Sequence, residues 1–174
     1  RGHGSPDDRV LEEGDIVGID IGLRLKGFCG EACVTYPVGR VAPHVDRLLA
    51  IGREALHLGI NAAQYNNRLN DIGRAIEDYA DTQGVTVVHE WGGHGIGRVL
   101  HENLSVSHIR QSDPGPRLLP GMTFTIEPMI NEGTYEWILK PDGWTVITAD
   151  GKLSVQFEHM LAITHNGPDI LTRL

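Results

Sequence analysis

Apolar and polar residues alternate near the beginning of the chain, which predicts a pair of strands. The run DIVGIDI at residues 15–21 has the alternation typical of a half-buried strand, with Asp15 and Asp20 on opposite faces. A second strand, over about residues 23–36, follows closely enough to be its hairpin partner. Strict alternation along this second strand places Cys29, Glu31 and Cys33 on one face.

Two amphipathic helices are expected next. Over residues 46–63, apolar side chains recur at helical spacing at Leu48, Leu49, Ile51, Ala55, Leu56 and Ile60. A second helix starts at or is capped by Asp71 and continues to about residue 83, where Gly84 ends it. The buried face of this helix is expected to carry Ile72, Ala75, Ile76, Tyr79 and Ala80.

The second half of the chain is expected to be mainly strands. The run VTVVHEW at residues 85–91 is strand-like, and the glycines of GGHGIG at residues 92–97 are expected to let the backbone turn tightly around His94. Further strands are expected around Glu127, over residues 144–148 and over residues 153–164, whereas residues 105–116 show no periodicity. The predicted class is α+β, with helices packed on one face of a largely antiparallel, strongly curved sheet.

Length and charge narrow the functional classes. A chain of 174 residues is long enough for one buried core, and we expect a single domain over residues 1–174. The net charge of −8 argues against a nucleic-acid partner and suits a basic peptide or amine better. The sequence has no apolar run of the roughly 20 residues that a membrane span needs and no leader, so we expect a soluble, cytoplasmic protein with no membrane partner.

Six short motifs, in this order, resemble the methionine aminopeptidases, whose fold is called pita-bread. The motifs are HGSPDD at His3, GDIVGID ending at Asp20, GHGIGR at His94, TIEPM around Glu127, DGWTV around Trp144 and QFEH around Glu158. The likeness extends from His3 almost to the end of the chain. No additional subdomain separates His94 from Glu127, which is similar to the type I branch of the family.

The resemblance implies a metal centre and roles for individual residues. It makes five residues the ligands of two divalent metal ions, namely Asp20, Glu31, His94, Glu127 and Glu158. One imidazole and four carboxylates suit Co, Mn, Fe or Zn, and two such ions activate a water for hydrolysis. Glu127 would shuttle the proton, and His3 and His101 would contact the substrate and the developing tetrahedral intermediate. Trp144 would line the pocket for the first side chain, and the implied reaction is removal of an N-terminal methionine from peptides or nascent proteins.

The chain departs from the family pattern beside one of these ligands. The family has Asp where this chain has Glu31, in a His-Gly-Asp-Thr setting that here reads Cys29, Gly30, Glu31, Ala32. The additional methylene displaces the carboxylate by roughly 1.5 Å if the backbone stays in place. We therefore expect a distorted, weaker or mononuclear site and reduced activity. Cys29 and Cys33 are expected to be reduced thiols, because two cysteines do not define a disulfide framework.

A second departure concerns the beginning of the chain, which opens at Arg1 without an initiating methionine. Pita-bread proteins are built from two similar halves, each with a helix pair, and this chain contains only the second pair. We expect an N-terminally truncated catalytic domain whose uncovered sheet self-associates or binds a separate N-terminal fragment.

Other interpretations stay open from the sequence. Related pita-bread hydrolases act on X-Pro peptides, and a descendant that has lost catalysis would be a binding module. A lone Asp on a strand is usually an edge residue, and Trp144 could equally be a core aromatic. The remaining histidines are interpreted as surface or structural residues, namely His44, His57, His89, His108, His159 and His165.

Overall fold

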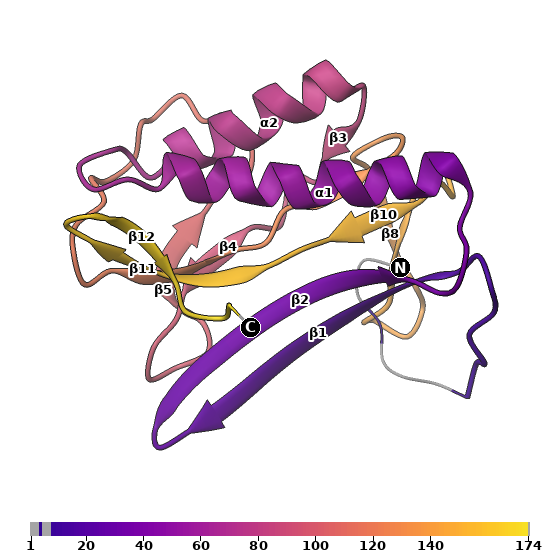
Figure 1. Ribbon diagram of the computed structural model, residues 1–174, viewed down its shortest axis with the longest axis horizontal. Helices are drawn as coiled ribbons and strands as arrows, with labels where there is room; N and C mark the ends of the chain where they lie inside the picture. Colours follow the sequence, from indigo (N-terminus) through magenta and orange to yellow (C-terminus); the bar gives the residue numbers. More distant parts are fainter. Residues whose placement is uncertain (1–3, 5–7, 174) are drawn as a thin grey trace.

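Two long helices lie on one side of a curved layer of strands, and a long hairpin lies on the other side (Figure 1). The structure is a computed structural model, and it describes residue 4 and residues 8–173. The helices are α1 (Pro43–Ala62) and α2 (Asp71–Gln83). The strands are β1 (Ile16–Leu25), β2 (Phe28–Pro37), β3 (Thr86–Val87), β4 (Gly93–Gly95), β5 (Glu102–Val106), β6 (Thr123–Ile126), β7 (Met129–Asn131), β8 (Trp137–Leu139), β9 (Val146–Thr148), β10 (Ser154–Gln156), β11 (His159–Thr164) and β12 (Gly167–Ile170).

The expected hairpin at the start of the chain is confirmed. Strands β1 and β2 pair antiparallel over their whole length, and the register places Asp20 opposite Cys33 and Gly22 opposite Glu31. Residues of a directly opposed pair share one face of a sheet, so Asp20, Glu31 and Cys33 point to the same side. Strand β1 presents four exposed apolar side chains between its polar positions, namely Ile19, Ile21, Leu23 and Leu25.

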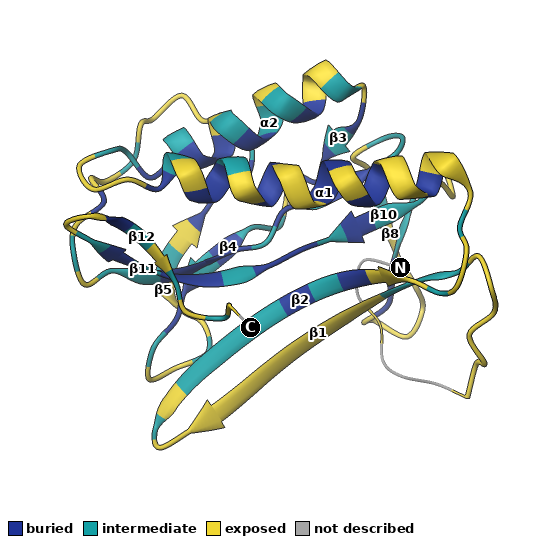
Figure 2. Ribbon diagram, in the orientation of Figure 1, coloured by how far each residue is buried: buried dark blue, intermediate teal, exposed yellow. Residues whose placement is uncertain are grey.

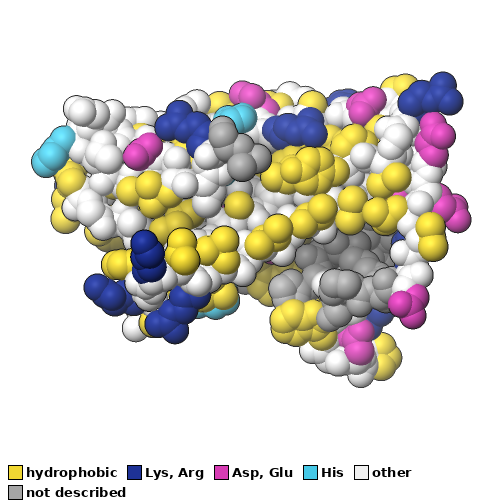
Figure 3. Space-filling model, turned by 60° about the horizontal axis from the view of Figure 1, so that its bottom comes forward, with side chains coloured by type: hydrophobic (Ala, Val, Ile, Leu, Met, Phe, Trp, Pro, Cys, Tyr) yellow, Lys and Arg dark blue, Asp and Glu magenta, His cyan; other side chains and the backbone are white. Residues whose placement is uncertain are grey.

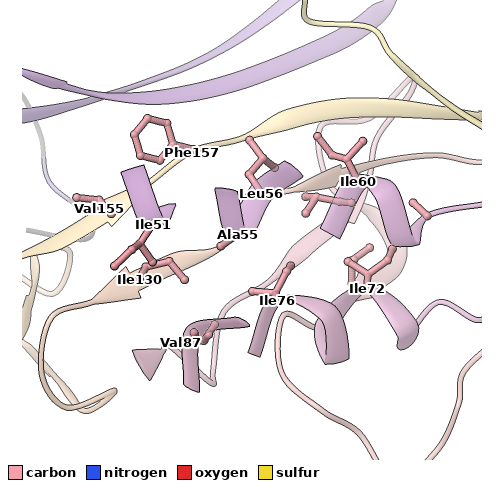
Figure 4. Close-up of a cluster of buried hydrophobic side chains, with 14 of the residues drawn as sticks. Ile51, Ala55, Leu56, Ile60, Ile72, Ile76, Val87, Ile130, Val155 and Phe157 are labelled. Carbon is pink, nitrogen blue, oxygen red and sulfur yellow. The ribbon is translucent and has the colours of Figure 1, made fainter. Parts of the chain in front are cut away.

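Both expected helices are confirmed, and their apolar faces build the core. Helix α2 ends at Gly84, whose left-handed φ of 68° is a conformation that glycine adopts without a steric penalty. Side chains of both helices interlock with strand residues in one cluster (Figure 4), which includes Ala55, Ile76, Ile130 and Phe157. In Figure 2, the buried residues, drawn in dark blue, lie on α1 and on the strands beneath it. Among the described residues, neither helix is apolar enough over a sufficient length to cross a membrane.

The strands that pack against the core form several antiparallel sheets. The largest has five strands in the order β12-β11-β6-β4-β5, and a second has the order β10-β7-β3. Strands β1 and β2 form a two-stranded sheet, and so do β8 and β9. The expected long strand over residues 153–164 is divided at Phe157 and Glu158, where β10 leaves one ladder and β11 enters another. The α+β class with helices on one face of a curved, antiparallel layer is confirmed.

Backbone and side-chain hydrogen bonds join the hairpin to this division point. The Glu158 N–H donates to the carbonyl oxygen of Cys33 at 2.8 Å. The Thr35 hydroxyl donates to the Gln156 carbonyl at 2.8 Å and accepts from the Gln156 N–H at 3.0 Å. Residues 31–35 of β2 are therefore held against residues 156–158, although more than 120 residues separate them in the sequence.

The prediction of a tight turn around His94 is wrong, because Gly93–Gly95 form β4, an inner strand of the five-stranded sheet between β6 and β5. The glycines serve close approach instead. A Cβ atom at Gly92 would collide with the carbonyl oxygen of Val106, and one at Gly93 would collide with the carbonyl oxygen of Thr125. Glycine therefore lets His94 lie between two neighbouring strands at short range.

The segment at residues 105–116 is tied to α2, although it has no periodicity. Arg110 forms ion pairs with three carboxylates of that helix, Glu77, Asp78 and Asp81. The backbone N–H of Leu69 donates to the carbonyl oxygen of Pro116 at 2.9 Å. Strands β5, β8 and β12 were not expected, because each is short and lacks a clear apolar alternation.

Candidate metal centre

The fold brings all five expected ligands together from five separate segments of the chain. Asp20 lies on β1, Glu31 on β2 and His94 on β4, while Glu127 directly follows β6 and Glu158 lies between β10 and β11. Their ligand atoms fall into sets in which each atom lies within 4.8 Å of the others. One set is Asp20, Glu31 and Glu158, and another is His94, Glu127 and Glu158. Glu158 is shared, so two cations held by these sets would lie side by side.

Unpaired buried oxygens indicate that this cage suits a cation. Glu158 is 1% exposed, and neither of its carboxylate oxygens has a hydrogen-bond partner within the described part of the chain. Glu31 Oε2 is also buried and has no hydrogen-bond partner among the described residues. A buried ionised carboxylate without compensation is costly, whereas a divalent cation would neutralise several at once. The donor set of four carboxylates and one imidazole fits divalent metal ions.

His94 is oriented so that one ring nitrogen faces the carboxylates. Its Nδ1 lies 3.1 Å from the carbonyl oxygen of Gly95, a contact that orients the ring from outside the cage. Its Nε2 lies 3.4 Å from Glu31 Oε2 and 3.5 Å from Glu127 Oε1. Burial lowers the pKa of His94, but the contact with the Glu31 carboxylate, the contact with the Gly95 carbonyl and the charge of Glu127 raise it above the ordinary value.

Two residues that the sequence analysis missed hold Glu127 in position. The Thr125 hydroxyl donates to Glu127 Oε1 at 2.7 Å and accepts from the His94 N–H at 3.0 Å, which links the two ligands. His108 Nε2 accepts from the Glu127 N–H at 3.2 Å, and complete burial lowers the pKa of His108 to about 3, so its ring is neutral. Thr125 is two residues before Glu127 on a strand, and this period-2 spacing could have identified it. No local signal points to His108.

Two carboxylates of the cage, those of Glu127 and Glu158, have raised pKa values in the metal-free state. Burial, together with the charges of Glu31 and Asp20, raises the pKa of Glu127 to about 7, although the Thr125 hydrogen bond and His94 act in the opposite direction. Burial and the charges of Glu127, Glu31 and Asp20 raise the pKa of Glu158 to about 10. Both shifts arise because acidic groups are gathered away from water without a compensating cation.

A cavity of about 800 Å³ opens onto the cage. Asp20, Glu31, His94 and Glu127 lie in its wall, while Glu158 lies beneath the cavity surface. The expected substrate residues His101 and Trp144 also line it, and Trp144 is 54% exposed, so it is not a core aromatic. A tilted pair of indole rings, from Trp91 and Trp137, adds an aromatic wall with ring centroids 4.8 Å apart. The expected residue His3 lies outside the described residues.

The cysteines and the other histidines stay outside these ligand sets. Cys29 and Cys33 are both free thiols, and burial and the acidic neighbours raise the pKa of Cys33. His159 Nδ1 lies 2.9 Å from the Thr172 hydroxyl oxygen, which gives this histidine a structural contact of its own. His89 stacks on Tyr135 with ring centroids 3.9 Å apart.

Comparisons with known proteins agree with this geometry. The model of metallopeptidase family M24 matches residues 2–165. Methionine aminopeptidase A of Synechocystis sp. is 46% identical over 171 residues, which cover 98% of this chain and 68% of the relative. Methionine aminopeptidase 1 of Bacillus subtilis is 45% identical over 99% of this chain and 69% of its own length. The chain thus spans about two thirds of the length of these relatives.

Solved structures show the same relationship. A crystal structure of methionine aminopeptidase from Rickettsia prowazekii has a TM-score of 0.95 at 43% identity, covering 98% of this chain and 69% of that one. A dipeptidase structure from Pyrococcus horikoshii has a TM-score of 0.77 at 23% identity, which shows a shared fold alone. The sequence identity, the shared fold and the ligand cage together show that this chain belongs to the methionine aminopeptidases of metallopeptidase family M24.

Proposed function

We propose that this protein is a metal-dependent aminopeptidase that removes the N-terminal methionine from peptides or nascent proteins. The observation that carries the proposal is the convergence of five ligand residues at a cavity large enough for the end of a peptide. The names of relatives that are about 45% identical support the same reaction. If nascent chains are the substrate, the reaction would take place in the cytoplasm. Residues 1–174 would act as one catalytic domain.

Two divalent ions, drawn from Co, Mn, Fe or Zn, are the proposed cofactors. Asp20, Glu31 and Glu158 would hold one ion, and His94, Glu127 and Glu158 would hold the other. Such ions supply an activated water and polarise the scissile carbonyl. The protein residues fit this role because the buried oxygens of Glu158 face the cage without other partners in the described chain.

Glu127 is the proposed proton carrier. Its carboxylate belongs to the ligand set of one proposed ion, where it can accept a proton from an activated water and release it again. Thr125 donates to its Oε1, and the Gln156 amide lies 3.4 Å from its Oε2, so the carboxylate is held in one orientation. Glu127 would take a proton from the attacking water and give it to the leaving amine.

The substrate would lie along the cavity wall. His101 is exposed next to His94 and would contact the carbonyl that is being cleaved. Trp144 would pack against the methionine side chain, and its partly exposed ring leaves an apolar surface available for it. We also propose a substrate contact for His3, and the support for it comes from the sequence alone. Cleavage of X-Pro peptides and a purely binding role are not favoured, since relatives of much higher identity are methionine aminopeptidases.

The exposed apolar side chains of β1 are the proposed basis of a further contact with protein. Figure 3 looks at the side on which the hairpin lies in Figure 1, and hydrophobic side chains gather across that face. Ile21, Leu23 and Leu25 are each more than half exposed. An apolar face of this kind favours association. We propose that the chain, when alone, covers it with a second copy of the same hairpin face.

The first prediction concerns turnover. With Mn²⁺ added, the chain should release methionine from the tripeptide Met-Ala-Ser, as measured by chromatography of the products. Glu127→Gln removes the proton carrier and should lower kcat by about 100-fold or more. Glu54→Gln, on the exposed face of α1, is the matched control and should leave kcat unchanged. Methionine release at the original rate by the Glu127 variant would contradict the assigned role.

The second prediction concerns the stability of the metal-free protein. The pKa of Glu158 is about 10 in the folded protein and 4.5 in its ordinary state. The folded state therefore binds more protons than the unfolded state between these values, so the free energy of unfolding falls as pH rises. Between pH 7 and 9, Glu158→Gln should flatten this decline in urea titrations, because the amide does not ionise. An equally steep decline in the variant would rule out Glu158 as its source.

The third prediction concerns the hairpin. At about 100 µM the chain should have twice its monomer mass of 19.1 kDa in light scattering. Leu23→Asp places a charge in the apolar row and should return the chain to a monomer, whereas Arg24→Asp on the neighbouring position should have a smaller effect. A monomer in the unchanged chain would exclude self-association. If a complex forms only after an N-terminal fragment is added, that fragment and not a second copy would be the partner of the hairpin face.

A further inference from the structure

A third set of ligand atoms lies at the edge of the cage and includes a residue outside the five expected ligands. Glu31, His94 and His101 each offer one atom within 4.8 Å of the other two. The imidazole rings of His94 and His101 have centroids 4.2 Å apart. This set shares His94 with one of the two sets described above and Glu31 with the other, and His101 is the member that neither of them contains.

The length of Glu31 creates this set. Its Oε2 lies 3.4 Å from His94 Nε2, and this oxygen has no hydrogen bond of ordinary geometry within the described chain. A shorter Asp side chain would withdraw the oxygen by up to about 1.5 Å, which leaves roughly 5 Å to the same nitrogen. The additional methylene therefore carries the carboxylate toward the two imidazoles as well as toward Asp20.

His94 can serve only one cation at a time. Its Nδ1 faces the Gly95 carbonyl at 3.1 Å, so Nε2 is the nitrogen available to a metal. The same Nε2 lies close to both Glu31 Oε2 and Glu127 Oε1, so the two ligand sets that contain His94 draw on one nitrogen. An ion between His94, Glu127 and Glu158 and an ion between Glu31, His94 and His101 consequently exclude each other.

We propose that Glu31, His94 and His101 form an alternative cation position, here called the two-histidine position, in which His101 is a metal ligand. Two neutral nitrogens and one carboxylate suit Zn²⁺, Co²⁺ or Fe²⁺ better than Mn²⁺ or Mg²⁺, which prefer oxygen. The exposure of His101 leaves room for water or another ligand to complete the coordination. The proposal depends on metal binding by the cage and not on turnover of a peptide.

Occupation of the two-histidine position changes what the other residues can do. An ion there takes the His101 imidazole, which then no longer faces the substrate. The same ion takes His94 from the set that contains Glu127 and Glu158. Zinc is therefore expected at the two-histidine position and manganese among the carboxylates, so the metal supplied decides which arrangement the protein adopts.

Zinc X-ray absorption spectroscopy tests the assignment directly. The metal-free chain receives slightly less than one equivalent of Zn²⁺ alone, and the number of imidazoles per zinc is fitted from the scattering of the rings. Two imidazoles are expected in the unchanged chain. His101→Ala should leave one imidazole and weaken zinc binding by at least about tenfold. Glu31→Asp should also give one imidazole, because the shorter carboxylate no longer reaches the pair of rings.

The control is His57→Ala, which removes an exposed histidine of α1 and should retain two imidazoles per zinc. One imidazole in the unchanged chain, or two in the His101 variant, would overturn the proposal. Its failure is distinguishable from failure of the peptidase. Methionine release with Mn²⁺ together with one imidazole per zinc would sink only the two-histidine position, and two imidazoles per zinc without methionine release in Mn²⁺ would sink only the proposed reaction.

Discussion

The main physical constraint on this protein is the repulsion between carboxylates that the fold gathers away from water. Glu158 is almost completely buried, and its two oxygens lack partners in the described chain, while Glu127, Glu31 and Asp20 contribute further negative charge around it. A protein could reduce this cost by protonation or by a bound cation. The raised pKa values of Glu127 and Glu158 show the first solution, and the arrangement of the ligand sets provides the second.

The surrounding fold holds these groups at short range against their repulsion. Hydrogen bonds between β2 and residues 156–158 hold Glu31 close to Glu158. Glycines at positions 92 and 93 let β4 approach its neighbours, and the Thr125 hydroxyl then connects the His94 backbone to the Glu127 carboxylate. The core under α1 and α2 supplies the rigidity that these contacts require. The cage thus depends on packing and hydrogen bonds that keep like charges close together.

The sequence predicted the elements whose signals are local. Both helices and the first hairpin follow from apolar periodicity, and Gly84 ends α2 where its left-handed backbone is needed. The role of the glycines around His94 was misjudged, because a glycine that permits a turn and one that permits close strand approach look the same in sequence. His108 was not identified as a support for Glu127, since 19 residues separate them and only the fold joins them. The short strands β5, β8 and β12 depend on partners and not on their own pattern.

Calorimetric titration of the metal-free chain with Mn²⁺ at pH 7.5, in two buffers of different ionisation heat, tests the central claim most directly. Because Glu158 holds a proton at this pH, with a pKa of about 10, a cation that binds the cage must displace it. We expect release of about one proton per chain as the first ion binds. Binding without proton release, or no binding at all, would contradict a cation-neutralised carboxylate cage.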